Sequence, residues 1–186
     1  MQPLRPTLWR TCRVLANESR LNLLRALFSC DESTVSALAV KTGISEAFAS
    51  TQLRALSARG LVSSRPAGRW MFYSFEPNMA VEHSETIGNA IRESFAAGAK
   101  NESLIAAATA FTHPRRISII KCLGEGEKTF PELLASTHIS TMALYRHLQK
   151  LTARNMVERK NNRYRQTKPG DTLGKTLLAI AATCSP

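Results

Sequence analysis

Basic side chains gather around two short turns of the sequence, one near residue 67 and the other near residue 161. Guanidinium and ammonium groups bind phosphate oxygens, and an arginine-rich hairpin can lie along a DNA backbone or enter the minor groove. A hairpin that faces RNA and a hairpin that is merely solvated are the alternatives. The residues concerned are Arg65 and Arg69 in the first turn, and Arg159, Lys160, Arg163 and Arg165 in the second.

A second group of side chains suited to hydrogen bonding follows Gly43-Ile44 and, later in the chain, His138-Ile139. Glutamine pairs bidentately with adenine, arginine pairs with guanine, and small hydroxyls bind bases or phosphates. We expect Arg54 and Arg146 to contact DNA, whereas Phe48 and Met142 are expected to be core or helix-packing residues. The candidate base-contacting residues are Ser45, Glu46, Ser50, Thr51, Gln52 and Arg54 in the first segment, and Ser140, Thr141, Tyr145, Arg146, His147 and Lys150 in the second.

The overall charge also favours a polyanionic partner. The 186 residues include 25 Lys and Arg against 14 Asp and Glu, which gives a net charge of +11 and an isoelectric point near 10.1. Residues 1–77 carry a net +5, residues 78–110 a net −2, and residues 111–186 a net +8. Two basic lobes thus flank a mildly acidic middle. This distribution indicates nucleic acid as the first choice of partner and an anionic membrane surface as the second.

The two lobes have similar sequences. Residues 15–27 align with residues 111–123 at an offset of 96, and the match then continues at an offset of 95 as far as Val62 and Val157. A period of this length is too long for a solenoid and fits a small duplicated domain. We therefore predict three parts, which are a first domain at 8–77, a helical connector at 78–110, and a second domain with a C-terminal helix at 111–186.

Within each copy, capping residues and apolar spacing predict short helices followed by a hairpin. Asn17, Thr34 (or Ser33) and Ser45 can begin the helices of the first copy, and Thr129 with Glu132 has capping-box spacing in the second. The expected strands are 61–65 and 70–75, then 156–160 and 163–167. We therefore predict a mainly α fold with small β-hairpins, in which two tandem winged helix-turn-helix domains pack through long helices. In this motif the second helix enters the major groove.

The first copy resembles the ArsR-type transcriptional regulators. The resemblance covers nearly all of residues 8–77, and the second copy, about 105–183, shows it more loosely because it lacks the glycines after its helices. It implies a transcriptional regulator, expected to be a repressor, that binds specific double-stranded DNA sequences. Family members usually act as homodimers of one domain, so two copies imply a covalent pseudo-dimer, and a homodimer of the whole chain stays possible. The motifs are Leu15-Ala16-Asn17-Glu18-Ser19-Arg20-Leu21, Thr34-Val35, Gly43-Ile44-Ser45, Gly60-Leu61-Val62 and Phe72-Tyr73-Ser74.

The residues do not support the metal sensing that the resemblance also implies. Family members often bind metal through cysteines on the first helix of the motif, or through carboxylates and histidines on the last helix. The first location has no cysteine between Thr34 and Ala39, and on the helix expected after the first hairpin His83 faces away from Glu82 and Glu85. The cysteines, Cys12, Cys30, Cys122 and Cys184, lie far apart in the sequence. We expect neither a metal nor a cofactor.

Other classes of function are less well supported. The sequence holds no glycine-rich phosphate loop, no paired carboxylates in an apolar setting and no Ser/His/Asp arrangement, so we expect no enzymatic activity. It also shows no secretory signal and no membrane-spanning stretch, so we expect a cytoplasmic protein. Two further functions stay open. One is a protein-docking or dimerisation module in which one unit has lost DNA contact, and the other is a sensor gated by a small molecule.

Overall fold

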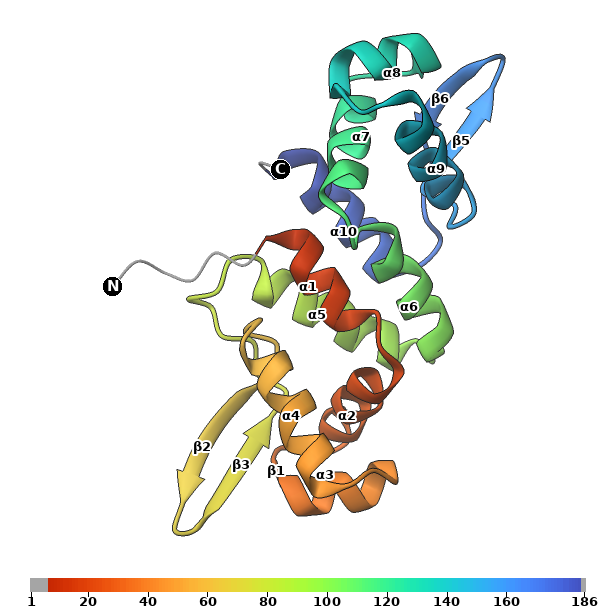
Figure 1. Cartoon of the computed structure of the whole chain (residues 1–186). Helices are drawn as coiled ribbons and strands as arrows, with labels where there is room; N and C mark the ends of the chain where they lie inside the picture. Colours follow the sequence, from red (N-terminus) through yellow and green to blue (C-terminus); the bar gives the residue numbers. More distant parts are fainter. Residues whose placement is uncertain (1–6, 185–186) are drawn as a thin grey trace. The chain divides into compact units, whose positions relative to one another are not determined.

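The computed structural model of the chain describes residues 7–184, which divide by their contacts into two compact units. Unit 1 comprises residues 14–105, and unit 2 comprises residues 7–13 together with residues 106–184. In each unit a set of short helices is followed by a small antiparallel sheet (Figure 1). The expected fold class is confirmed, because the chain is mainly helical and carries two helix-turn-helix units in tandem, each with a hairpin.

The boundary between the units runs through the segment that its composition marked as a connector. Helix α5 (Ser84–Ala96) lies wholly in unit 1, whereas α6 (Asn101–Ala110) begins in unit 1 and ends in unit 2. Most of helix α1 (Leu8–Leu15) belongs to unit 2, although it precedes the first motif in the sequence. Residues 78–110 are therefore shared between the units.

Side-chain caps set where the helices of unit 1 begin. The side chains of Asn17, Thr34 and Ser45 each accept a hydrogen bond from a backbone N–H three residues later, at 3.0–3.3 Å. Gly43 ends α3 with a left-handed φ of +68°, as a helix-ending glycine commonly does. In order after α1, the elements of unit 1 are α2 (Glu18–Phe28), β1 (Ser33–Thr34), α3 (Val35–Thr42), α4 (Glu46–Ser57), β2 (Ser63–Ala67), β3 (Trp70–Ser74) and α5.

Unit 2 repeats this order with different caps. His113 stands where unit 1 has Asn17, and its Nδ1 accepts a hydrogen bond from the Arg115 N–H at 3.1 Å. Thr129 and Glu132 form the predicted capping box. His138 takes the left-handed conformation, with φ +53°, at the position of Gly43. After α6 follow α7 (Pro114–Gly124), β4 (Lys128–Thr129), α8 (Phe130–Thr137), α9 (Thr141–Thr152), β5 (Val157–Lys160), β6 (Arg163–Gln166) and α10 (Thr172–Thr183).

Each sheet has a third strand that the sequence did not predict. Strand β3 lies between β2 and β1, and β6 lies between β5 and β4. The added strands β1 and β4 are two residues long and end at the N-caps of α3 and α8, so they connect the hairpin to the helices. Asn161 and Asn162 both have positive φ, as the tight turn of a two-residue hairpin requires. We call β2–β3 with its turn wing 1, and β5–β6 with its turn wing 2.

Aliphatic side chains from the three helices of each motif fill its core. The fully buried residues include Leu24, Leu38, Leu53 and Leu56 in unit 1, and Ile120, Leu133, Leu144 and Leu151 in unit 2. Burying each such side chain contributes about 1.5–3 kcal/mol, so the core fixes which face of α4 and of α9 points outward. Across residues 7–184, none of the helices has the length and apolar character needed to cross a membrane.

Candidate nucleic-acid interface

Helix α4 presents one face to solvent in unit 1. Leu53 and Leu56 are buried on its inner side, which leaves Ala47, Thr51 and Arg54, spaced by four and three residues, on the outer side. The Arg54 guanidinium donates a hydrogen bond to Ser50 Oγ at 3.1 Å, one turn earlier. The outer face of α4 therefore carries hydroxyls and a guanidinium, which are groups that can form hydrogen bonds with base edges.

Helix α9 presents the corresponding face in unit 2, with larger side chains. Met142, Arg146 and Gln149 occupy the positions of Ala47, Thr51 and Arg54 in the repeat, and all three are exposed. Tyr145 and Lys150 are exposed on either side of this row. The two helices thus have the same orientation in their units but offer different chemical groups.

The structure places most of the expected base-contacting residues on these outer faces. Ser50 is half-buried, and Gln52 and His147 are buried in their units, with 7% and 9% of their surfaces exposed. Gln52 and His147 therefore do not belong to the outer faces of α4 and α9. The exposed members are Ser45, Glu46, Thr51 and Arg54 in unit 1, and Ser140, Thr141, Tyr145, Arg146 and Lys150 in unit 2.

Phe48 and Met142 differ from a second expectation, which was that both are core or helix-packing residues. Phe48 is 43% exposed and Met142 is 69% exposed, so for Met142 in particular the expectation is wrong. The reason is helical geometry. Met142 precedes the buried Leu144 by two residues, and residues two apart on a helix point in widely different directions.

Gln52 connects two helices of unit 1. Its Oε1 accepts a hydrogen bond from Arg20 Nη1 at 2.7 Å, and the Nε of the same arginine donates to the carbonyl oxygen of Val14. Burial lowers the pKa of Arg20 from its ordinary value. Arg20 thus ties the start of α2 to the middle of α4. It is a positioning residue that the sequence analysis missed.

Arg116 holds the equivalent place in unit 2. Its Nε donates to the Ala110 carbonyl oxygen at 2.6 Å, and its Nη2 donates to the Thr109 carbonyl oxygen at 2.9 Å and to Thr112 Oγ1. The aligned repeat contains the signal for this role, because Arg20 and Arg116 are the same residue type at the same position.

His147 occupies the position of Gln52 but contacts a different partner. Its ring centroid lies 4.6 Å from that of His113, and among the described residues its buried Nδ1 has no hydrogen-bond partner. Burial, together with His113 and the nearby charges of Arg116, Arg115 and Lys150, lowers the pKa of His147 to about 4. The imidazole is therefore neutral in the folded protein at pH 7.

This burial predicts acid sensitivity of unit 2. Because the folded protein disfavours protonation of His147, the stability that the neutral ring contributes is complete above about pH 6.5 and is lost as the pH falls toward 4. The loss amounts to at most about 3 kcal/mol in the free energy of unfolding. Urea unfolding of the wild type and of His147→Gln, which carries the residue of unit 1, measures it. The wild type should lose more stability than the variant between pH 7 and pH 4, whereas parallel losses would contradict the prediction.

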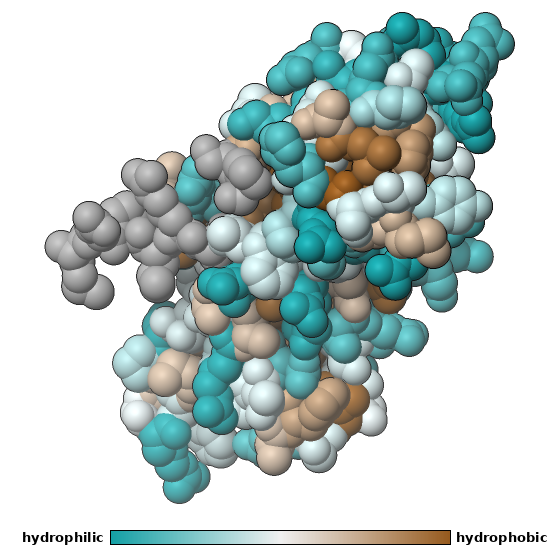
Figure 2. All heavy atoms as spheres, turned by 45° about the horizontal axis from the view of Figure 1, so that its top comes forward, coloured by the Kyte–Doolittle hydropathy of each residue, from teal (hydrophilic) through white to brown (hydrophobic). Residues whose placement is uncertain are grey.

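The predicted basic residues lie on the two wings, and wing 2 packs against α9. In wing 1, Arg65 is paired with Glu32 and lies over the Phe72 ring, while Arg69 lies over Trp70, which is 49% exposed. In wing 2, Arg159 bonds Asn162 and lies over the Tyr164 ring. The projecting end of wing 2 is covered by hydrophilic side chains, coloured teal at the upper right of Figure 2.

Wing 2 and α9 share a surface hollow of about 470 Å³. Its lining includes Tyr145 and Gln149 from α9 together with Arg159 and Tyr164 from the wing. The structure therefore brings Tyr145 and Arg159, which were predicted separately, onto one continuous surface.

Carboxylates offset part of the charge of wing 2. Arg165 Nε lies 2.6 Å from Glu158 Oε1 and its Nη1 lies 3.4 Å from Glu127 Oε1, and Arg163 lies 3.5 Å from Glu132. The hydrogen bond and charge of Glu158 raise the pKa of Arg165 above its ordinary value. Arg159, in contrast, contacts the neutral Asn162 and Tyr164.

This difference predicts unequal contributions to the salt dependence of DNA binding. Changing both Arg159 and Lys160 to glutamine should reduce the slope of log K against log [salt] by about two, because each phosphate contact contributes about 0.9. The matched pair of changes, Arg163→Gln with Arg165→Gln, should reduce it by less, since those guanidinium groups already face carboxylates. Fluorescence anisotropy over a salt series gives both slopes. Equal reductions would contradict the assignment.

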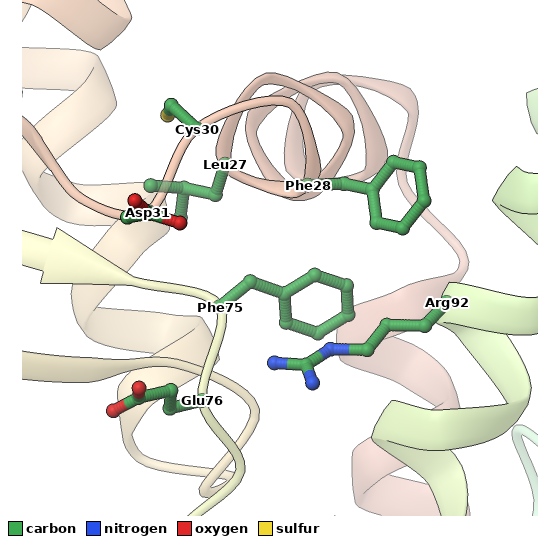
Figure 3. Close-up of a pocket in the computed structure, with 7 residues that line it drawn as sticks. All are labelled: Leu27, Phe28, Cys30, Asp31, Phe75, Glu76 and Arg92. Atoms are coloured by element: carbon green, nitrogen blue, oxygen red, sulfur yellow. The ribbon is translucent and has the colours of Figure 1, made fainter.

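Unit 1 also contains a hollow of about 450 Å³ away from α4 and the tip of wing 1. It is lined by Leu27, Phe28, Cys30, Asp31, Phe75, Glu76 and Arg92 (Figure 3). The Arg92 guanidinium lies over the Phe75 ring, 4.9 Å from its centroid, and the Phe28 ring faces this pair from the opposite wall (Figure 3). The hollow thus offers aromatic rings and charges of both signs. Within residues 7–184, no three His, Cys, Asp or Glu side chains are grouped closely enough to hold a metal ion.

Comparison with known protein families finds the same family in both copies of the internal repeat. The family model described as "Bacterial regulatory protein, arsR family" matches residues 17–64 and again residues 113–159, together more than half of the chain. Each match begins at the N-cap of the first helix of its motif, at Asn17 and at His113. No curated protein matches the chain.

Proposed function

Because the chain belongs to the arsR family of bacterial regulatory proteins, we propose that it binds specific sequences of double-stranded DNA and thereby regulates transcription. The observation that carries this proposal is the pairing, in both units, of an exposed polar face on the second helix of the motif with a basic wing. The helix supplies groups that distinguish bases, and the wing supplies contacts to the backbone.

Selection of bound sequences from a random duplex pool, with the full chain, tests this proposal. A specific regulator should enrich a defined sequence. The absence of enrichment would instead favour a docking module, in which helix and wing surfaces bind another protein. The basic wings argue against that alternative, because a docking wing has no need of positive charge.

The two faces are proposed to read different half-sites. The row Ala47, Thr51 and Arg54 in α4 corresponds to Met142, Arg146 and Gln149 in α9, and no residue is shared between the rows. A homodimer of identical units reads a palindrome, whereas a single chain with two different readers should prefer an asymmetric site.

We propose that binding represses transcription by occupying promoter DNA, and that the chain acts in the bacterial cytoplasm, where that DNA lies. A reporter gene placed behind the selected sequence tests the direction of regulation. Expression should fall when the chain is present and should recover in a variant that lacks Arg54 and Arg146. We propose no catalytic role for either unit, because the family is one of regulatory proteins.

The hollow in unit 1 favours a second candidate function, in which a small molecule binds there and modulates DNA binding. Its volume of about 450 Å³ lies in the range of ligand sites, and its lining offers Phe28 and Phe75 for an apolar group and Arg92 for an anionic one. Native mass spectrometry of the chain purified from a bacterial host tests this candidate. A retained small molecule that is lost in Phe28→Trp, which fills the hollow, would support it, whereas a chain that never retains one would count against it.

A further inference from the structure

Large apolar side chains lie exposed in the first turn of both α4 and α9. Met142 of α9 is 69% exposed and Phe48 of α4 is 43% exposed. Ala47, at the position of Met142 in the repeat, is exposed as well. The other exposed side chains on the outer faces of these helices are mostly polar or charged, so the apolar ones require a separate explanation.

Their place on the helix is that of base-contacting residues. Met142 precedes Arg146 by one helical turn and Gln149 by two, so the three side chains form one outward row. Ala47 begins the equivalent row in α4. The N-terminal residues of a recognition helix are those that contact base edges in the major groove. Met142 and Ala47 therefore begin the two outward rows, and Phe48 is exposed one residue after Ala47 in the same first helical turn.

The major groove presents one apolar group for such side chains, the C5-methyl group of thymine, and alanine and phenylalanine are among the residues that contact it. A methionine side chain offers a flexible, polarizable surface for the same contact. We infer that apolar side chains of both helices select thymine at defined positions of the two half-sites, through contact with its methyl group. In α9 this residue is Met142, and in α4 the residues are Phe48 and Ala47. The inference rests on the proposed function.

The charges around these side chains favour DNA over a protein as the occupant. On the same helix, Arg146 is exposed one turn after Met142 and Lys150 is exposed about two turns after it, and wing 2 adds further cations to that unit. An apolar protein partner would have to cover these cations, whereas a DNA duplex brings phosphates to them on either side of the groove.

Replacing thymine with deoxyuridine tests the inference, because uracil lacks only the methyl group and keeps the same hydrogen-bonding edge. In the duplex obtained by selection with the full chain, each thymine is changed singly, and dissociation constants are measured by anisotropy at fixed salt. The wild type should lose about fourfold in affinity at one or more thymines, the effect of removing one buried methyl group. Met142→Ala or Phe48→Ala should bind the thymine duplex more weakly and no longer distinguish it from uracil at that position. Met79→Ala, which alters an exposed methionine outside both helices, should keep the wild-type ratio.

The results of this experiment distinguish a failure of the thymine inference from a failure of the proposed DNA-binding function. A selected duplex in which uracil is tolerated at every position, or in which Met142→Ala and Phe48→Ala both keep the wild-type ratio, would overturn the inference alone. A selected sequence without thymine would do the same. The absence of any preferred duplex would overturn both the inference and the proposed function.

Discussion

Replacing Arg54 or Arg146 with alanine is expected to lower affinity for the selected duplex by about tenfold or more, with a much smaller loss on random DNA. Both guanidinium groups are exposed on the outer rows of their helices, and a bidentate contact to guanine accounts for about 1–3 kcal/mol of discrimination. Arg54 is held toward its own helix by Ser50, which limits the freedom that it loses on binding.

Competition of each variant between the selected duplex and random duplex measures this difference. Arg10→Ala is the matched control, because it removes an exposed arginine from α1, outside both helices and both wings. It should leave the ratio of specific to random binding unchanged. Equal losses on both duplexes for Arg54→Ala and Arg146→Ala would show that these residues contact only phosphates.

Replacing Arg116 with alanine is expected to lower the free energy of unfolding of unit 2 by about 3 kcal/mol. The guanidinium is buried and donates to two carbonyl oxygens and one hydroxyl between the end of α6 and the start of α7. Removing it leaves the buried Ala110 carbonyl oxygen without its donor, which costs about 1–3 kcal/mol, and also removes the part-buried bonds to Thr109 and Thr112.

Urea unfolding followed by circular dichroism measures the effect. Arg115→Ala is the control, because this neighbouring arginine is exposed and a surface substitution changes stability by about 0.5 kcal/mol at most. An Arg116→Ala variant as stable as Arg115→Ala would contradict a clamping role. Reduced DNA binding by Arg116→Ala under conditions in which unit 2 stays folded would show, in addition, that Arg116 supports the DNA-binding surface of unit 2.

The caps and the repeat allowed much of the fold to be predicted from the sequence. Asn17, Thr34 and Ser45 begin their helices as expected, and the Thr129–Glu132 capping box is present, because these interactions involve residues only three apart. The strands β1 and β4 were missed, since two residues give no periodicity and pair with partners more than 30 residues away.

The candidate site was harder to predict at the level of single residues. The sequence indicates which helix carries the candidate residues, but the exposure of each side chain depends on the exact rotation of that helix on its core. Gln52 and His147 are therefore buried although their chemistry suits base contact, and Met142 is exposed although its chemistry suits a core. The pairing of Arg165 with Glu158 and Glu127 also depends on strand register and on a loop distant in sequence.

We propose that one chain carries two different DNA-reading helices, α4 and α9. The most direct test is the mass of the complex between the full chain and the selected duplex, measured by native mass spectrometry and compared with the symmetry of that duplex. We predict one chain on an asymmetric site, with affinity lost when either half-site is scrambled. Two chains on a palindrome would contradict this account and would show that one unit reads DNA while the other assembles the dimer.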